Sequence, residues 1–230
     1  MKKSNKLLLA GFLAVVLLIT AIHISLYAKY KNGDYTIFHE ADLSPQSMEP
    51  FPNILFVSMR NVSGATVKFS DVAGIEKVDE SDIKYVRKGD TLLITGRHGI
   101  HDQDFNYPVE FHLPYNVRLS LHNSSLSFRP GKTTALNNPV IYLQKSQAFF
   151  SGTDAPLQFT HVKVIAADSS AVLFHGNTQV NNLEVQLTNS SFEYGEGNFG
   201  QLSVITDSLS RLSLQSKHLL KANIKTIAPQ

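Results

Sequence analysis

The chain has 230 residues, of which 43% are hydrophobic and 17% charged, with no cysteine and a formal net charge of +2. Three lysines precede a long apolar segment near the amino terminus, and without them 18 of the 21 basic residues remain, against 19 acidic ones. The rest of the chain is therefore near neutral and lacks the basic surface of a nucleic-acid-binding protein. Without cysteine, its stability has to come from a packed core rather than from disulfides.

An apolar segment, LLLAGFLAVVLLITAIHISLY, occupies residues 7–27. Its length matches the roughly 20 residues with which a helix crosses the hydrocarbon core of a bilayer. The lysines before it, with the initiator amine, favour an amino terminus in the cytoplasm. We therefore expect residues 1–28 to form a cytoplasmic stub and an uncleaved transmembrane signal anchor, with the rest of the chain in the periplasm or outside the cell. The alternative is a signal peptide cleaved after Ala28, although Leu26 fits poorly at the small-residue position of such a site.

Two regions lie between this segment and the repeats described below. Residues 29–53 contain three prolines and no sustained hydrophobic periodicity, which is typical of a tether. Residues 54–116 have the composition of short strands with tight turns, among them a hairpin that turns at Lys88, Gly89 and Asp90. We expect irregular first strands that cap the repeat region, because the end of a stack of strands is otherwise an open edge.

From residue 117 the chain repeats itself about every 21 residues. The copies are VRLSLHNSSLSF, PVIYLQKSQAFF, VKVIAADSSAVLF, LEVQLTNSSFEY and QLSVITDSLSRL. They align on corner serines, which are Ser124, Ser146, Ser169, Ser190 and Ser208. Three positions before the serines lie Leu121, Leu143, Ala166, Leu187 and Ile205, and five positions before them lie Leu119, Ile141, Val164, Val185 and Ser203. Four positions after them lie Phe128, Phe150, Leu173, Tyr194 and Leu212.

Side chains alternate between the two faces of a strand, so the first two columns belong to one interior wall and the third column to another. This pattern predicts an all-β fold, a single-stranded parallel β-helix or solenoid with turns of about 21 residues. We expect this domain to occupy residues 54–230, with regular repeats over residues 117–215 and a carboxy-terminal cap over residues 216–230.

The corners have a chemistry of their own. The residues that precede the corner serines are Asn123, Lys145, Asp168, Asn189 and Asp207. Asn and Asp tolerate left-handed backbone and bond to their own main chain, which a sharp corner requires. We interpret this row as structural, and the alternative is a row of carboxylates and hydroxyls that serves catalysis or binds calcium.

The runs GATVKFSDVAG, KGDTLLITG and FHLPYNVRLSLHNSSLSF resemble the exported bacterial adhesin-head proteins, including the GIN-domain family, over about residues 54–225. In that family a strand pair ending in a Gly-Asp-x-Leu-x-Ile-like element is followed by a Leu-Pro step and β-helical turns. The resemblance implies a surface-associated β-helix with a right-handed coil. The corners here are Asn-Ser-Ser and Asp-Ser-Ser where the family has Gly-Ser-Gly, and the resemblance implies no particular binding residue.

The densest group of metal-ligating residue types lies in the segment RHGIHDQDF and the strands after it. Its members are His98, His101, Asp102 and Asp104, with His112 and His122 as further donors. Two histidines at this spacing, with carboxylates, bind zinc or another divalent metal when they are held rigidly. The segment has loop composition and no helix to hold the histidines, so we favour a solvent-exposed polar loop and keep the metal site as the alternative.

Together these features favour a membrane-anchored, extracytoplasmic β-helix of the bacterial envelope that binds a glycan or an envelope protein through its long polar side, as an adhesin does. Catalytic motifs and cofactor fingerprints are absent from the sequence, so we expect neither an enzyme nor a cofactor. One alternative is a scaffold that assembles end to end through open strand edges. The other is a carbohydrate-active enzyme, whose carboxylates would be Asp168 and Asp207.

Overall fold

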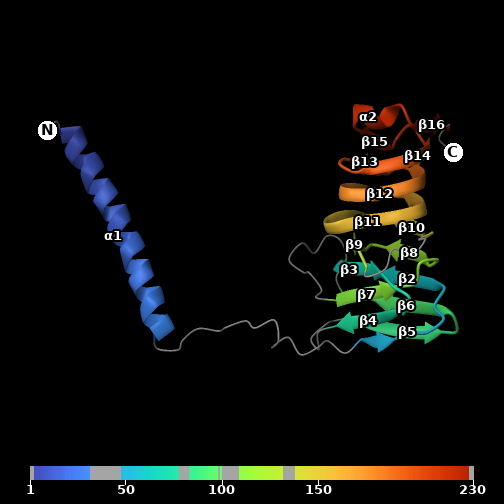
Figure 1. Cartoon of the computed structure of the whole chain (residues 1–230), viewed down its shortest axis with the longest axis horizontal. Coiled ribbons are helices and arrows are strands. Elements are labelled where there is room, and N and C mark those ends of the chain that lie inside the picture. The colour runs from blue at the N-terminus through green and yellow to red at the C-terminus, as the bar shows by residue number, and fades with distance from the viewer. Residues whose placement is uncertain are drawn as a thin grey trace. The chain divides into compact units, whose positions relative to one another are not determined.

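The computed structural model describes residues 3–31, 48–77, 83–97, 99, 109–131 and 138–227. The chain divides into two compact units, Met1–Pro45 and Gln46–Gln230. The first unit contains helix α1 (Lys3–Lys31), and the second contains the strands. Strands make up 61% of the structure and wind into a parallel β-solenoid of about five turns, each about 22 residues long (Figure 1). The predicted fold class is confirmed, whereas the handedness of the coil stays a prediction.

Helix α1 is apolar along most of its length. Its segment Gly11–Lys29 has a mean hydropathy of 2.2 over 19 residues, and none of it is buried within the structure. A helix that is apolar on every side is stable only when lipid or protein surrounds it. The helix is therefore long and apolar enough to cross a membrane, a property that it shares with signal sequences. The topology of the chain stays a prediction.

Three walls of parallel strands form the solenoid, and the longest of them is called here the first wall. Its strands, in spatial order, are β6 (Thr91–Thr95), β2 (Phe56–Arg60), β8 (Arg118–His122), β10 (Val140–Gln144), the last part of β11 (Gln147–Ala167), the last part of β12 (Ala171–Thr188), β14 (Asn198–Thr206) and β16 (Ala222–Thr226). Every pairing between neighbours in this wall is parallel, as the sequence predicts for a solenoid.

The second wall follows the corner of each turn. Its strands are β7 (Val109–Leu113), β3 (Ser63–Phe69), β9 (Ser125–Arg129), the first parts of β11 and β12, β13 (Ser191–Tyr194) and β15 (Arg211–Leu214). A short third wall is formed by residues 157–159, 178–180 and 198–199, which pair across three consecutive turns.

Antiparallel strands close the amino-terminal end of the solenoid. Strand β5 (Lys84–Lys88) pairs with β6 through a hairpin, and Gly89 in its turn has a φ of +63°. This confirms the predicted hairpin, because two-residue hairpin turns require positive φ. Strand β4 (Gly74–Lys77) pairs with β7 on one side and with β1 (Glu49–Pro50) on the other. The Tyr85 hydroxyl donates a hydrogen bond to Glu49, which raises the pKa of Tyr85 to about 12.

The first turns of the solenoid do not follow chain order. The turn formed by β2 and β3 lies between the turn formed by β6 and β7 and the turn formed by β8 and β9. Along the chain, β2 and β3 thus form the second turn of the stack, β6 and β7 form the end turn, and β8 and β9 form the third turn, from which the solenoid continues (Figure 1). The irregular region predicted at residues 54–116 has this arrangement.

The corner alignment is wrong by one position in the third turn. The strand register pairs Ser146 with Ser170, so Ser169 does not occupy the equivalent corner position. The reason is an extra residue: Asp168 and Ser169 both have positive φ, at 56° and 64°, whereas Asn123 alone turns the first corner. Every position after this corner shifts with it, and the residue that enters the core is Phe174 in place of Leu173.

The fifth turn departs from the predicted alignment for the same reason. Its corner also contains one residue more, so Ser210 rather than Ser208 pairs with Ser190. The residues that take the column positions of this turn are Val204, Thr206 and Leu214, in place of Ser203, Ile205 and Leu212. With these corrections the column that ends in Val204 and the column that ends in Leu214 are apolar throughout, whereas the column of Leu121, Leu143, Ala166 and Leu187 ends in the buried Thr206.

Stacked aromatic rings fill the interior behind the second wall. Phe150 lies between Phe128 and Phe174, with ring centroids 4.5 and 4.2 Å away and nearly parallel planes. Tyr194 continues the stack at 5.2 Å from Phe174. All four rings are buried, because the parallel register places them at the same inward position of successive turns.

A ladder of buried hydroxyls joins the corners of the turns. The backbone N–H of each corner residue donates to the serine Oγ of the next turn, at 3.0–3.3 Å. The donors are Val62, Ser124, Ser146, Ser170 and Ser190, and the acceptors are Ser124, Ser146, Ser170, Ser190 and Ser210. The serines therefore satisfy buried main-chain groups, a function that apolar side chains cannot perform.

The polar residues before the ladder serines turn the backbone, as predicted. Asn123, Lys145 and Asn189 have φ of 46–49°, and even the lysine adopts this left-handed conformation. Asp207 is different, because positive φ is not found there. Its carboxylate instead accepts a hydrogen bond from the backbone N–H of Asn189 at 2.9 Å.

Candidate functional site

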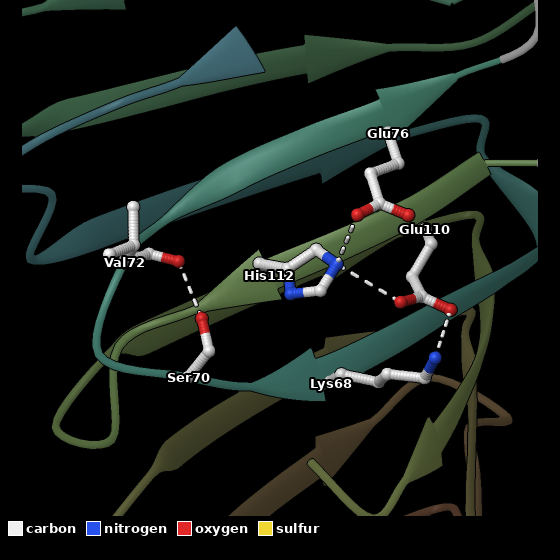
Figure 2. A network of polar contacts seen from close by, with 6 residues as sticks. All are labelled: Lys68, Ser70, Val72, Glu76, Glu110 and His112. Carbon is white, nitrogen blue, oxygen red and sulfur yellow. Dashed lines mark hydrogen bonds and ion pairs between the residues drawn. The ribbon is translucent and has the colours of Figure 1, made fainter. Parts of the chain in front are cut away.

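A cluster of charged side chains lies on the outer face of the second wall, near the amino-terminal end of the solenoid. It consists of Lys68 on β3, Glu76 on β4, and Glu110 and His112 on β7 (Figure 2). In β7 these two residues alternate with buried residues, so the pleat of the strand directs both of them outward. Glu76 lies directly opposite Glu110 in the antiparallel pair, and Lys68 lies opposite His112 in the parallel pair.

His112 lies between the two carboxylates. Its Nε2 is 3.0 Å from Oε1 of Glu110 and 3.3 Å from Oε1 of Glu76. This nitrogen is shielded from solvent, and although it is close to both oxygens it is not aligned with either as a hydrogen-bond donor. The other carboxylate oxygen of Glu110 accepts from Lys68 Nζ at 2.6 Å.

The cluster concentrates negative charge. Two like charges directly opposite each other on neighbouring strands destabilise a sheet, and here they are two glutamates. Among the residues that the structure describes, Lys68 forms an ion pair with Glu110, and the basic side chain beside Glu76 is His112. The arrangement therefore places two carboxylates and an imidazole nitrogen, all of them potential metal ligands, close together.

A cleft of about 630 Å³ lies beside the cluster. Its lining residues are Met48, Lys68, Phe69, Ser70, Asp71, Val72, Glu76, Glu110, His112, Pro130 and Gly131. A short hydrogen bond of 2.5 Å from the Ser70 hydroxyl to the Val72 carbonyl fixes the turn after β3 (Figure 2). Residues of this turn line one side of the cleft. The three cluster side chains with ligand atoms thus face an opening that admits a small molecule.

A second surface feature, called here the lateral groove, lies on the first wall across β11, β12, β14 and β16. Its volume is about 450 Å³. The strand register places His161, Asn182 and Gln201 side by side, one from each of three turns. Glu184 contacts both basic side chains of β11, with its carboxylate oxygens 3.6 Å from His161 Nε2 and 3.5 Å from Lys163 Nζ. The groove is therefore lined mainly by hydrogen-bonding side chains in a regular array.

The structure describes only some of the site residues that were predicted from the sequence. His98, His101, Asp102 and Asp104 lie outside the residues that the structure describes. His122 lies at the end of β8, and the described part of the structure does not bring it into the cluster around His112.

The two aspartates considered for catalysis have structural contacts. Asp207 is buried and accepts hydrogen bonds from the Ser210 hydroxyl at 2.5 Å and from the backbone N–H of Asn189 at 2.9 Å. The hydrogen bond with Ser210 and those with backbone N–H groups lower the pKa of Asp207. Asp168 accepts a hydrogen bond from the side-chain amide of Gln144 at 2.8 Å. Both carboxylates thus accept hydrogen bonds from the neighbouring turn, which supports the structural interpretation of this row.

Sequence reasoning missed Glu76 and Glu110. They share no short motif with His112, because Glu76 comes from a different strand and only the antiparallel register of β4 and β7 brings it close. One signal was readable: Glu110 and His112 are two residues apart within the alternating segment YPVEFHLPYN, so they share one face of a strand.

Comparison with known proteins does not identify the chain. Neither a family model, nor a curated protein, nor a solved structure matches it. A functional proposal therefore rests on the geometry of the surfaces described above.

Proposed function

We propose that the protein is a membrane-anchored, extracytoplasmic β-solenoid that binds a hydroxyl-rich polymer, in the first instance a glycan of the cell envelope, through its lateral groove and without catalysis. The observation that carries the proposal is the regular array of amide, imidazole and carboxylate groups along this groove. Consecutive turns of a solenoid are about 4.8 Å apart, so the array offers hydrogen bonds at a constant repeat, which suits an extended polymer.

Two further features support the proposal. Helix α1 provides an apolar segment of sufficient length to hold the solenoid at a membrane, and the exported chain expected from the lysines before it would face the envelope. The resemblance to adhesin-head and GIN-domain proteins agrees with a surface-associated binding protein. The absence of catalysis is part of the proposal, because the buried Asp207 is already used by its own corner.

The test is binding of the full chain, in detergent or in nanodiscs, to a panel of envelope glycans. The double variant Asn182→Ala/Gln201→Ala removes two amides of the groove, and we expect it to weaken binding at least tenfold. The matched control is Gln179→Ala, which removes an exposed amide of β12 on the third wall and should leave binding unchanged. Equal effects of the two changes, or no binding across the panel, would contradict the proposal.

A second candidate, end-to-end self-association, is favoured by apolar side chains at the carboxy-terminal end. Strands β15 and β16 each pair on one side only within the described residues, and the neighbouring Leu219 and Leu220 are 52% and 91% exposed. At the other end, β5 carries Lys84, Arg87 and Lys88, and charged side chains on an edge strand oppose the addition of a further strand. Light scattering across a hundredfold concentration range distinguishes the candidates, because growing rods would favour assembly and a constant mass would favour the binding module.

A further inference from the structure

We propose that Glu76, Glu110 and His112 bind a divalent transition-metal ion, with Zn²⁺ as the first candidate. Within the described residues, this is the one group of three histidine or acidic side chains whose ligand atoms lie within 4.8 Å of one another. The site is separate from the lateral groove, so it goes beyond the binding function proposed above.

The distances fit a coordination sphere. In a tetrahedral zinc site with bonds of about 2.0–2.2 Å, neighbouring ligand atoms are about 3.3–3.6 Å apart. The two distances from His112 Nε2, 3.3 Å to Glu76 and 3.0 Å to Glu110, lie within a few tenths of an ångström of this range. Small side-chain rotations of the glutamates are therefore sufficient to place an ion between the three atoms.

The state of the imidazole supports the same assignment. His112 Nε2 is buried and forms no aligned hydrogen bond, even though two carboxylates are within reach. A protonated imidazole that simply neutralised these carboxylates would direct its N–H at one of the oxygens. An imidazole that shares an ion with them needs its nitrogen near both oxygens and aimed at neither, which is the observed arrangement.

The donor set also limits the metal and its role. One imidazole and two carboxylates suit zinc and similar ions, and three protein ligands leave a fourth position for water or for a group of a bound molecule. The cleft lies beside that position. Lys68 contacts Oε2 of Glu110, while Oε1 faces His112 Nε2, so Lys68 orients this carboxylate while opposing the charge of the ion.

The ion would join two strands at the end of the solenoid, because its ligands come from β4 and β7, and Lys68 of β3 is linked to the site through its ion pair with Glu110. Binding to the folded state alone raises its stability by linkage. At a zinc concentration about 100-fold above the Kd, we expect the midpoint of thermal unfolding to rise by about 5–10 °C for a unit of this size.

The experiment is calorimetric titration of the metal-stripped full chain in detergent with ZnCl₂, with four variants. His112→Gln should weaken zinc binding more than tenfold and abolish the thermal shift, whereas His161→Gln, which removes a histidine paired with a single glutamate, should do neither. Lys68→Met should tighten binding, since it removes a competing positive charge while keeping the length of the side chain. The double variant His98→Gln/His101→Gln should retain the site.

Cobalt gives an independent readout, because Co²⁺ in a four-coordinate protein site shows visible d–d absorption that His112→Gln should remove. Circular dichroism of each variant confirms that it is folded. The proposal would be overturned by the absence of saturable binding, by loss of binding only in the His98→Gln/His101→Gln variant, or by weaker zinc binding in Lys68→Met.

Discussion

The buried hydroxyl of Ser146 holds two turns of the solenoid together, and its removal should have a defined cost. Ser146 is 0% exposed, and its Oγ accepts from the backbone N–H of Ser124 at 3.1 Å and donates to the carbonyl of Gln144 at 2.8 Å. Ser146→Ala removes both contacts. The Gln144 carbonyl still accepts from the N–H of Asn123 at 3.0 Å, so the N–H of Ser124 is the group that loses its acceptor.

The expected loss of stability follows from this single backbone N–H that is left without an acceptor. A buried N–H without an acceptor costs about 1–3 kcal/mol, and alanine creates almost no cavity in place of serine. We therefore expect Ser146→Ala to lower the free energy of unfolding by about 2 kcal/mol. For a folded unit of this size that corresponds to a decrease of about 4–8 °C in the unfolding midpoint.

Urea unfolding of the full chain in detergent measures the free energy, and amide hydrogen exchange at Ser124 measures the local effect. The matched control is Ser120→Ala on the exposed face of β8, which should change the free energy by less than about 0.5 kcal/mol. If Ser146→Ala and Ser120→Ala unfold alike, or if the Ser124 amide keeps its protection, the ladder does not contribute to stability and the reasoning is refuted.

Two further predictions concern the core and the carboxy-terminal end. Phe150→Ala opens a cavity between two stacked rings and should lower the free energy of unfolding by about 4 kcal/mol. The control is Phe56→Ala, at a side chain that is 37% exposed, which should lower it by about 1 kcal/mol or less. Urea titration compares the two variants, and similar losses would contradict a stabilising role of the stack. Burial lowers the pKa of His218, in α2 (Ser216–Leu219), from its ordinary value of 6.5, so the native state binds fewer protons than the unfolded state. Its contribution to stability is present above pH 6.5 and is lost as the pH falls below that value, so the protection factors of the β16 amides, which are exchange rates corrected for the intrinsic rate at each pH, should fall between pH 7 and pH 5. His218→Gln should remove most of this dependence, and protection factors that stay constant with pH in the unmodified chain would disprove it.

The repeat was readable from sequence because each turn buries the same positions. Leu121, Leu143, Ala166 and Leu187 do pair in consecutive turns, as the alignment predicted. The shift at Ser169 was not readable, because Asp-Ser-Ser resembles Asn-Ser-Ser and an extra left-handed residue changes the geometry without changing the composition. Alternation around the corner fits either register, and only pairing with the neighbouring turns selects one.

The order of the first turns and the position of Glu76 in the charged cluster could not be predicted from the sequence, for a related reason. Alternation in residues 54–116 identifies strands and their inward faces but carries no information on which strand lies beside which. Glu76 and His112 are neighbours only because β4 turns back antiparallel to β7 at the end of the stack. A site that depends on strand order cannot be recovered from residue spacing alone.

The out-of-order first turn has a mechanical consequence. A force that pulls on the chain before β1 would reach β2, which has β6 on one side and β8 on the other. A terminal strand at the edge of the stack would be peeled away one hydrogen bond at a time. A strand with two neighbours has to slide against both ladders at once, so the load is shared between them. The arrangement therefore makes β2 harder to pull out of the solenoid than a strand at the edge of the stack.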